Sequence, residues 1–352
     1  MPSKLVSVAR LAPGSILSES VMTANGKVLI NNHAVLTTKM ITSLENWNIQ
    51  SVAIVDDAAV EDMPIEEPAD VRGLAKEYEQ FAENYESVVS SVTNSLDFIH
   101  RQKIIPIHMF RDTSNEIVIS MEQSGTALVH RLLVTEGKME DLVSRNAVTV
   151  AYLAGNLARH MNWSEKDIRG VILAGLLHDV GKIMLNKSEQ PKPHAHIVEV
   201  AKLLTQVKGI PNEVVLGVVQ HHEYVDGTGM PTRVPGDKIH PYAKLIGIVD
   251  IFQSAAFMKN YSNPFPALDI LGSEMFGRLD LGMCQMFINQ IKDSLMNTEV
   301  LLSDGRVGEV VFFHPTKAAT PIVKTVNMEI VDLSVARGIR LERVLAPKAI
   351  VS

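Results

Sequence analysis

The chain has little of what several classes of protein depend on. It contains one cysteine, Cys284, so no internal disulfide, zinc finger or thiolate cluster can form, and a reducing compartment is expected. No stretch reaches the roughly 18 apolar residues of a membrane-spanning helix. Arg10 and Pro13 interrupt the apolar core that a signal peptide would need. We therefore expect a cytoplasmic protein without a membrane span.

Basic and aromatic residues are also scarce. Lys and Arg number 33 against 40 Asp and Glu, so the formal charge is -7 and no basic surface for a polyanion is expected. General binding to nucleic acid is disfavoured, whereas a small phosphate ligand could still be held locally. Aromatics make up 5% of the residues, which predicts a core of Leu, Ile, Val, Ala and Met.

The 352 residues are enough for more than one folded unit. Residues 1–56 show short apolar runs between turn signals and predict a small β-rich or α+β unit. Residues 57–70 are acidic and contain two prolines, which indicates a linker. Apolar residues at three- and four-residue spacing over 71–296 predict packed helices. Residues 297–352 return to short strands and predict a small β appendage.

Two helices of the 71–296 segment have recognisable ends. Ser164 is a good N-cap with acidic Glu165 and Asp167 in the first turn, and this helix is expected to stop near Gly181. Pro211 suits the first turn of another helix. The predicted fold class is therefore mainly α.

Two motifs and two separate side chains carry the candidate chemistry. The segment LLHDVGK contains His178 and Asp179, and HHEYVDGTGMP runs from His221 to Pro231. Imidazoles and carboxylates are ligands of divalent metals, and one carboxylate can bridge two metals about 3.5–4 Å apart. We predict a metal cluster from these residues: His178, Asp179, His196, His221, His222 and Asp250.

Each of these residues also has a plainer structural interpretation. An isolated His-Asp pair is usually a polar pair at a helix end, and Lys182 alone could complement the helix dipole. Asp226 with Gly227 and Gly229 could be a simple tight loop. Asp250 lies in an apolar run, where an unpaired buried carboxylate is costly. The order and spacing of the whole set favour the metal cluster.

At these residues the chain resembles the HD-GYP family, a branch of the HD metal-dependent phosphohydrolases. The family's HDxGK element is similar to residues 178–182, and its HHExxDGxGYP element is similar to residues 221–231. The resemblance covers roughly Leu142 to Gln290. It implies an HD-type helical bundle with small β-rich units at both ends, and two divalent metal ions that could be Fe, Mn, Ni or Zn.

The resemblance also implies a role for each residue. Asp179 would bridge the two metals, one held by His178 and Asp250, the other by His196, His221 and His222. Catalysis would rest on Asp179 and on Lys182, which would neutralise charge on the phosphoryl oxygens. The implied substrate-binding residues are Lys182, Asp226, Gly227, Gly229 and Lys259.

The chain departs from the family pattern at four positions. Asn146 stands where the family has its first ligand histidine and remains a candidate ligand through its amide oxygen. Leu142 replaces a glutamate that allows a third metal in some members. Met230 replaces the tyrosine of the GYP element. Lys259 replaces an arginine, which keeps the charge and loses the bidentate fork.

The activity implied by the resemblance is hydrolysis of cyclic di-GMP to pGpG and GMP by a metal-activated water. Two alternatives stay open. A degenerate domain would bind the nucleotide or a partner protein without turnover, as Asn146 and Met230 suggest, and a broader HD phosphohydrolase would act on another nucleotide. A signalling protein partner and a homodimer also stay open, as does whether the helix predicted from Val71 to about His100 packs on its own domain.

Overall fold

The structure is a computed structural model that describes residues 3–12, 15, 17–19, 21–22, 28–30, 36, 40–41, 44, 49–55, 69–135, 142–185, 194–258, 261–315 and 317–346. The chain divides into two compact units, Met1–Ala69 and Asp70–Val351. Most of the predicted acidic linker, residues 57–70, lies outside the described residues. Each unit is described by itself.

The first unit is built from short antiparallel strands. β1 (Ser3–Ser7) leads into η1 (Val8–Arg10) and pairs with β4 (Ser51–Val55), while β2 (Val21–Met22) pairs with β3 (Val28–Ile30). The β-rich prediction for this unit is confirmed. Its buried apolar residues form a core separate from that of the second unit: Val8, Leu17, Val21, Leu36, Leu44, Val52 and Ile54.

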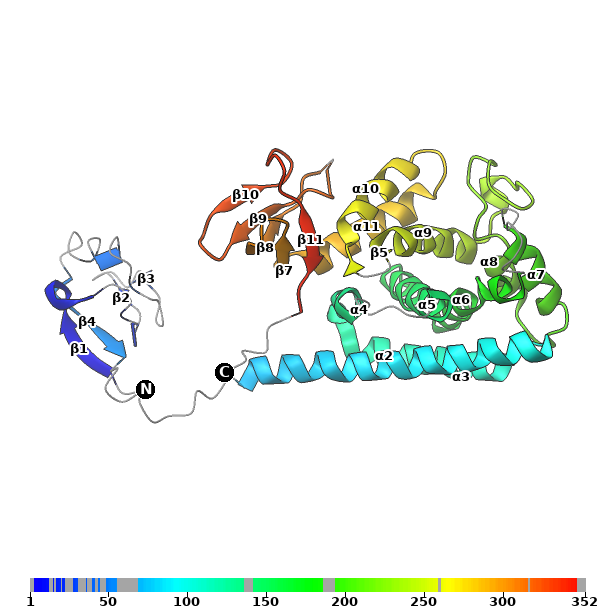
Figure 1. Cartoon of the computed structure of the whole chain (residues 1–352), viewed down its shortest axis with the longest axis horizontal. Helices are drawn as coiled ribbons and strands as arrows, with labels where there is room; N and C mark the ends of the chain where they lie inside the picture. The colour runs from blue at the N-terminus through cyan, green and yellow to red at the C-terminus, as the bar shows by residue number, and fades with distance from the viewer. Residues whose placement is uncertain are drawn as a thin grey trace. The chain divides into compact units, whose positions relative to one another are not determined.

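A long helix opens the second unit. α2 (Ala69–Gln102) is followed by α3 (Ile107–Ser124). In Figure 1 the cyan α2 runs along α4 (Leu128–Thr135) and α5 (Leu142–His160), and the Tyr85 hydroxyl lies 2.9 Å from Thr149 Oγ1 on α5. The question left open by the sequence is thereby answered, because α2 buries one face against its own unit. The apolar residues of that face recur every three or four positions: Phe81, Tyr85, Val88, Val92, Leu96 and Ile99.

Helices make up most of the second unit, as predicted. α5 and α6 approach so closely that a Cβ added to Gly175 would lie 3.0 Å from Ala151 Cα. α9 packs against both of these helices. The elements are η3 (Gly125–Ala127), α4 (Leu128–Thr135), α5 (Leu142–His160), α6 (Glu165–Leu177), η4 (Val180–Met184), α7 (Ala195–Leu204), α8 (Asn212–Val219), η5 (Gly236–Lys238), α9 (Pro241–Ala256), β5 (Phe257–Met258), β6 (Tyr261–Ser262), α10 (Pro264–Glu274) and α11 (Leu281–Leu295).

The helix starts read from the sequence agree with the structure. Ser164 caps α6 by accepting a hydrogen bond from Asp167 N at 3.2 Å, and α8 begins directly after Pro211. The predicted end of α6 near Gly181 was wrong. The helix stops at Leu177, because Asp179 leaves helical geometry at φ -104° and ψ 3° and η4 follows.

A five-stranded antiparallel sheet follows α11 in the order β10-β9-β8-β7-β11. Its core residues Val300 and Val310 belong to the same buried cluster as the helices, and Phe313 stacks on Phe265 of α10 at 6.1 Å. The boundary predicted at residue 297 stays a prediction about domains. The strands are β7 (Glu299–Leu302), β8 (Val307–Phe312), β9 (Ile322–Thr325), β10 (Ile330–Asp332) and β11 (Leu341–Val344).

Within the described part of the chain, no helix has both the length and the apolar character that crossing a bilayer requires.

Candidate metal centre

His178 and Asp179 occupy the turn between α6 and η4. They are 0% and 1% exposed, so this polar pair is wholly enclosed. His178 Nδ1 donates to the Gly175 carbonyl at 2.7 Å, which directs Nε2 toward the opposite side, into the centre. A histidine held in this way by its own helix is set up as an Nε2 ligand.

His196 lies on the first turn of α7 and is brought to the pair by a close backbone contact. A Cβ added to Gly181 would lie 1.9 Å from the His196 carbonyl oxygen, so only glycine fits between η4 and α7. His196 Nε2 lies 3.6 Å from Asp179 Oδ1. The glycine of the HDxGK motif therefore positions the next predicted ligand.

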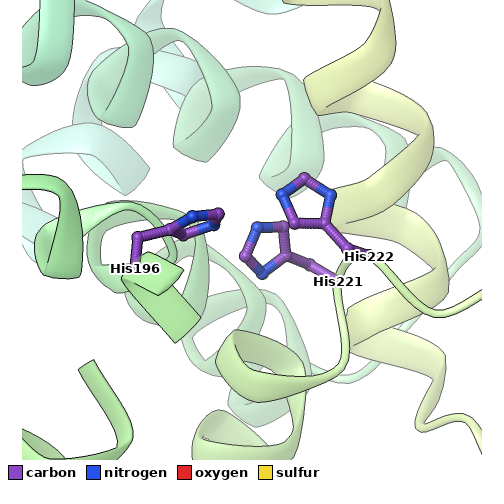
Figure 2. Close-up of side chains that lie close together, drawn as sticks. All are labelled: His196, His221 and His222. Atoms are coloured by element: carbon purple, nitrogen blue, oxygen red, sulfur yellow. The ribbon is translucent and has the colours of Figure 1, made fainter. Parts of the chain in front are cut away.

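The His221-His222 pair follows the end of α8. His221 Nδ1 donates to the Val218 carbonyl at 2.6 Å, the same arrangement as in His178. Figure 2 shows its ring beside those of His222 and His196, and the ring centroids of His221 lie 4.1 Å and 5.6 Å from these two. Three imidazoles from two segments of the chain thus meet at one point.

Asp250 completes the arrangement from α9, where it is 8% exposed. Its Oδ1 lies 3.5 Å from His178 Nε2, and Asp179 Oδ2 lies 3.3 Å from the same nitrogen. His178 therefore faces two carboxylates. Asp179 reaches in both directions, with Oδ2 toward His178 and Oδ1 toward His196.

The described residues hold two groups whose ligand atoms lie within 4.8 Å of one another: His196 with His221 and His222, and His178 with Asp179 and His221. A buried polar atom without a partner costs about 1–3 kcal/mol, and such atoms converge here. They fit a bound cation, which would satisfy several at once. The unpartnered atoms are Asn146 Oδ1, His178 Nε2, Asp179 Oδ1, His196 Nε2, His221 Nε2 and Asp250 Oδ1.

The neutral state of three imidazoles supports the same fit. Burial lowers the pKa of His196 and of His222 to about 4 and holds that of His221 well below its usual range, so these imidazoles are neutral at pH 7. Burial also acts to lower the pKa of His178, but the carboxylates of Asp179 and Asp250 raise it to about 10. The centre thus concentrates negative charge around His178.

Asn146 and Lys182 both contact Asp179. Asn146, on α5, donates from Nδ2 to Asp179 Oδ2 at 2.9 Å, and Lys182 Nζ lies 2.5 Å from the same oxygen. The Lys182 side chain is 41% exposed, so it reaches the buried carboxylate from solvent. Burial acts to raise the pKa of Asp179, yet His178 and Lys182 hold it well below its ordinary value.

The predicted substrate residues of the second motif lie in the loop after His222. Asp226 is exposed and accepts from Thr228 N and Oγ1, while Gly227 adopts φ +74°. Gly229 packs on the loop's own backbone, since an added Cβ would lie 2.2 Å from Tyr224 N. The half-buried Met230 donates its N–H to the His222 carbonyl at 2.9 Å. Lys259 lies outside the described residues.

Three residues at the centre were not assigned from the sequence. Gly247 of α9 allows close packing, because an added Cβ would lie 2.6 Å from the His221 carbonyl oxygen. A glycine inside an otherwise apolar helical segment was the available signal. His194 adopts φ +59°, and its ring centroid lies 4.8 Å from that of His222. Glu223, directly after the histidine pair, is 6% exposed.

The family model described as "HD domain" matches residues 134–280. The cyclic di-GMP phosphodiesterase PA4108 of Pseudomonas aeruginosa is 26% identical over 251 residues, 64% of this chain and 60% of that protein. The cyclic di-GMP phosphodiesterase response regulator RpfG of Xanthomonas campestris is 25% identical over 172 residues, 40% of this chain and 46% of that protein. The 3'3'-cGAMP-specific phosphodiesterase 1 of Vibrio cholerae is 29% identical over 146 residues, 37% of this chain and 34% of that protein.

The chain spans 60% of the first of these relatives and less than half of the other two. Among solved structures, Bd1817, an HDG"Y"P protein from Bdellovibrio bacteriovorus, is similar with a TM-score of 0.50 at 16% identity. That likeness covers 83% of this chain and 100% of the other, and it supports the fold. With the two motifs gathered at one buried centre, these matches support an HD domain over residues 134–280 that is similar to the HD-GYP proteins.

Proposed function

We propose that the second unit is a metal-dependent phosphodiesterase that hydrolyses cyclic di-GMP to pGpG and GMP. The observation that carries the proposal is the convergence of buried, unpartnered imidazole and carboxylate atoms around Asp179. The relatives support the substrate class, because their names specify cyclic di-GMP or 3'3'-cGAMP, both cyclic dinucleotides.

Two divalent cations are proposed, with Asp179 between them. One would be held by His178, Asp250 and Asp179 Oδ2, the atoms that lie 3.3–3.5 Å from His178 Nε2. The other would be held by Asp179 Oδ1 and by the three imidazoles of His196, His221 and His222. These ligand types suit Fe, Mn, Ni and Zn alike.

When bound, two such cations would supply a water acidified toward neutral pH and a positive clamp for phosphoryl oxygens. The chain's own residues would do the rest. The ammonium of Lys182 stands at the solvent side of Asp179 and would neutralise a phosphoryl oxygen of the substrate. The loop that carries Asp226, Gly227 and Gly229 would hold the nucleotide, as would Lys259.

The proposal is tested by incubating the metal-loaded protein with cyclic di-GMP and separating pGpG and GMP by chromatography. Mn²⁺ and Fe²⁺ are supplied in parallel, and 3'3'-cGAMP and a linear dinucleotide serve as competing substrates. The wild-type chain is expected to release pGpG, and Asp179→Ala is expected to release none above background. Equal release by the two proteins would reject the assignment of this centre.

A second function is favoured by a specific contact. Asn146 presents an amide N–H to Asp179 where the family pattern has a histidine. The proposed cation position beside His178 therefore has one imidazole ligand fewer than in the family pattern. The alternative is therefore a domain that binds the nucleotide without cleaving it. Tight binding of cyclic di-GMP by calorimetry, with no product in any metal, would support this alternative over the phosphodiesterase.

A further inference from the structure

Glu223 follows the two histidine ligands directly and is 6% exposed. Its Oε1 accepts hydrogen bonds from Thr232 N at 2.7 Å, from Thr232 Oγ1 at 2.7 Å and from Arg233 N at 3.1 Å. The partners lie nine and ten residues further along the chain. One carboxylate oxygen therefore closes the loop 223–233 on itself through three hydrogen bonds.

The far end of that loop requires such an anchor. Arg233 is a non-glycine residue at φ +56°, a conformation that persists only where surrounding contacts hold it. Glu223 accepts a hydrogen bond from the backbone N–H of this same residue. Gly229 meanwhile lies so close to the loop's start that an added Cβ would be 2.4 Å from Glu223 Cα. The loop is thus folded back onto Glu223 at two points.

The His221 imidazole is oriented by contacts outside the loop. His221 is held by the Val218 carbonyl through Nδ1, and its own backbone packs against Gly247 of α9. None of these contacts passes through Glu223. Loss of the Glu223 side chain is therefore expected to release the loop and to leave the His221 imidazole in place.

The second carboxylate oxygen of Glu223, Oε2, is buried without a hydrogen-bond partner among the described residues, which costs free energy. A buried carboxylate that uses one of its two oxygens is costly, and such a group calls for a specific explanation. Anchoring a strained loop beside the ligand pair supplies one.

We propose that Glu223 is a positioning residue that latches the loop 223–233 in the conformation that binds the nucleotide. The latch sets substrate affinity and contributes little to metal binding or to the chemical step. This inference rests on the proposed function for its substrate. Whether Glu223 holds the loop closed can also be measured in the absence of any nucleotide.

The test compares Glu223→Ala and Glu223→Gln in the full chain, with Glu165→Gln on the exposed first turn of α6 as the matched control. Glu223→Ala should raise the KM for cyclic di-GMP about tenfold or more, while kcat at saturation and metal content stay near wild type. Glu223→Gln keeps an acceptor for the three donors and should restore most of the affinity. The control should match wild type throughout.

Limited trypsin digestion provides the nucleotide-independent readout, because Arg233 is an exposed tryptic site at the latched end of the loop. Cleavage after Arg233 should accelerate about tenfold in Glu223→Ala. If Glu223→Ala does not fold, Thr232→Ala removes one donor and should give a smaller change in the same direction.

Loss of metal from Glu223→Ala, a fall in kcat with KM unchanged, or unchanged cleavage at Arg233 would each overturn the latch. If wild type neither binds nor cleaves any cyclic dinucleotide, the proposed function fails instead. The digestion then still decides whether Glu223 holds the loop.

Discussion

At the scale of single residues, the centre is defined by which atoms are left without a partner. His178 and His221 each donate Nδ1 to a carbonyl three residues earlier, so that both present Nε2 to the same interior point. The two carboxylate oxygens of Asp179 have different surroundings, because Asn146 and Lys182 contact Oδ2 while Oδ1 is unpartnered. The two proposed cation positions therefore differ in the polar groups that surround them.

Replacing Asn146 by histidine should strengthen metal binding. The imidazole would add a ligand where an amide N–H now points at Asp179, and an affinity gain of about tenfold is expected. Calorimetric titration of the metal-free protein with Mn²⁺ measures it. Asn156→His is the matched control, since this buried asparagine of α5 lies ten residues further along the same helix and bonds to Arg159. An unchanged affinity in Asn146→His would place Asn146 outside the ligand sphere.

At the scale of elements, the centre depends on close contacts that only glycine permits. Gly181 joins η4 to the His196 backbone of α7, and Gly247 joins α9 to the His221 backbone. These contacts bring together segments that carry one or two ligands each. Packing of elements therefore matters as much for the site as the identity of the ligands.

Gly181→Ala should destabilise the protein and reduce its metal content. The added methyl would overlap the His196 carbonyl, and relieving such an overlap costs about 1–3 kcal/mol or more. Urea unfolding and metal analysis measure the two effects. Gly272→Ala is the control, because nothing lies within 4 Å of its Cβ position in α10 and alanine favours a helix. Equal stability of the two variants would contradict the packing argument.

The contact between α2 and α4 predicts a pH effect on stability. His130 of α4 is buried and lies 2.5 Å from the Tyr78 hydroxyl of α2, and burial lowers its pKa to about 4. The unfolded chain, with a histidine pKa near 6.5, binds the proton more readily, so stability falls as pH drops from about 6.5 toward 4. This histidine should contribute about 2 kcal/mol of the loss between pH 7 and pH 5. Urea unfolding of His130→Gln should show a correspondingly smaller loss, and an identical pH dependence would contradict the assignment.

At the scale of the whole molecule, the sequence predicted the mainly helical unit and its β-rich neighbours because apolar periodicity changes along the chain. It also predicted which imidazole and carboxylate side chains lie together, since two motifs carry most of them in a family-specific order. The role of Glu223 could not be predicted, because its partners Thr232 and Arg233 meet it only after the loop folds back. The packing of α2 was equally inaccessible, since an amphipathic face does not specify what covers it.

The central claim is that separate elements of the second unit deliver ligands to one place, with Asp179 in contact with both cation positions. Its most direct test is the metal content of the purified, metal-saturated chain, measured by elemental analysis beside Asp179→Ala. The account predicts about two divalent ions per wild-type chain and a loss of both in the variant, because Asp179 is shared. Metal content that is unchanged in Asp179→Ala would contradict the account.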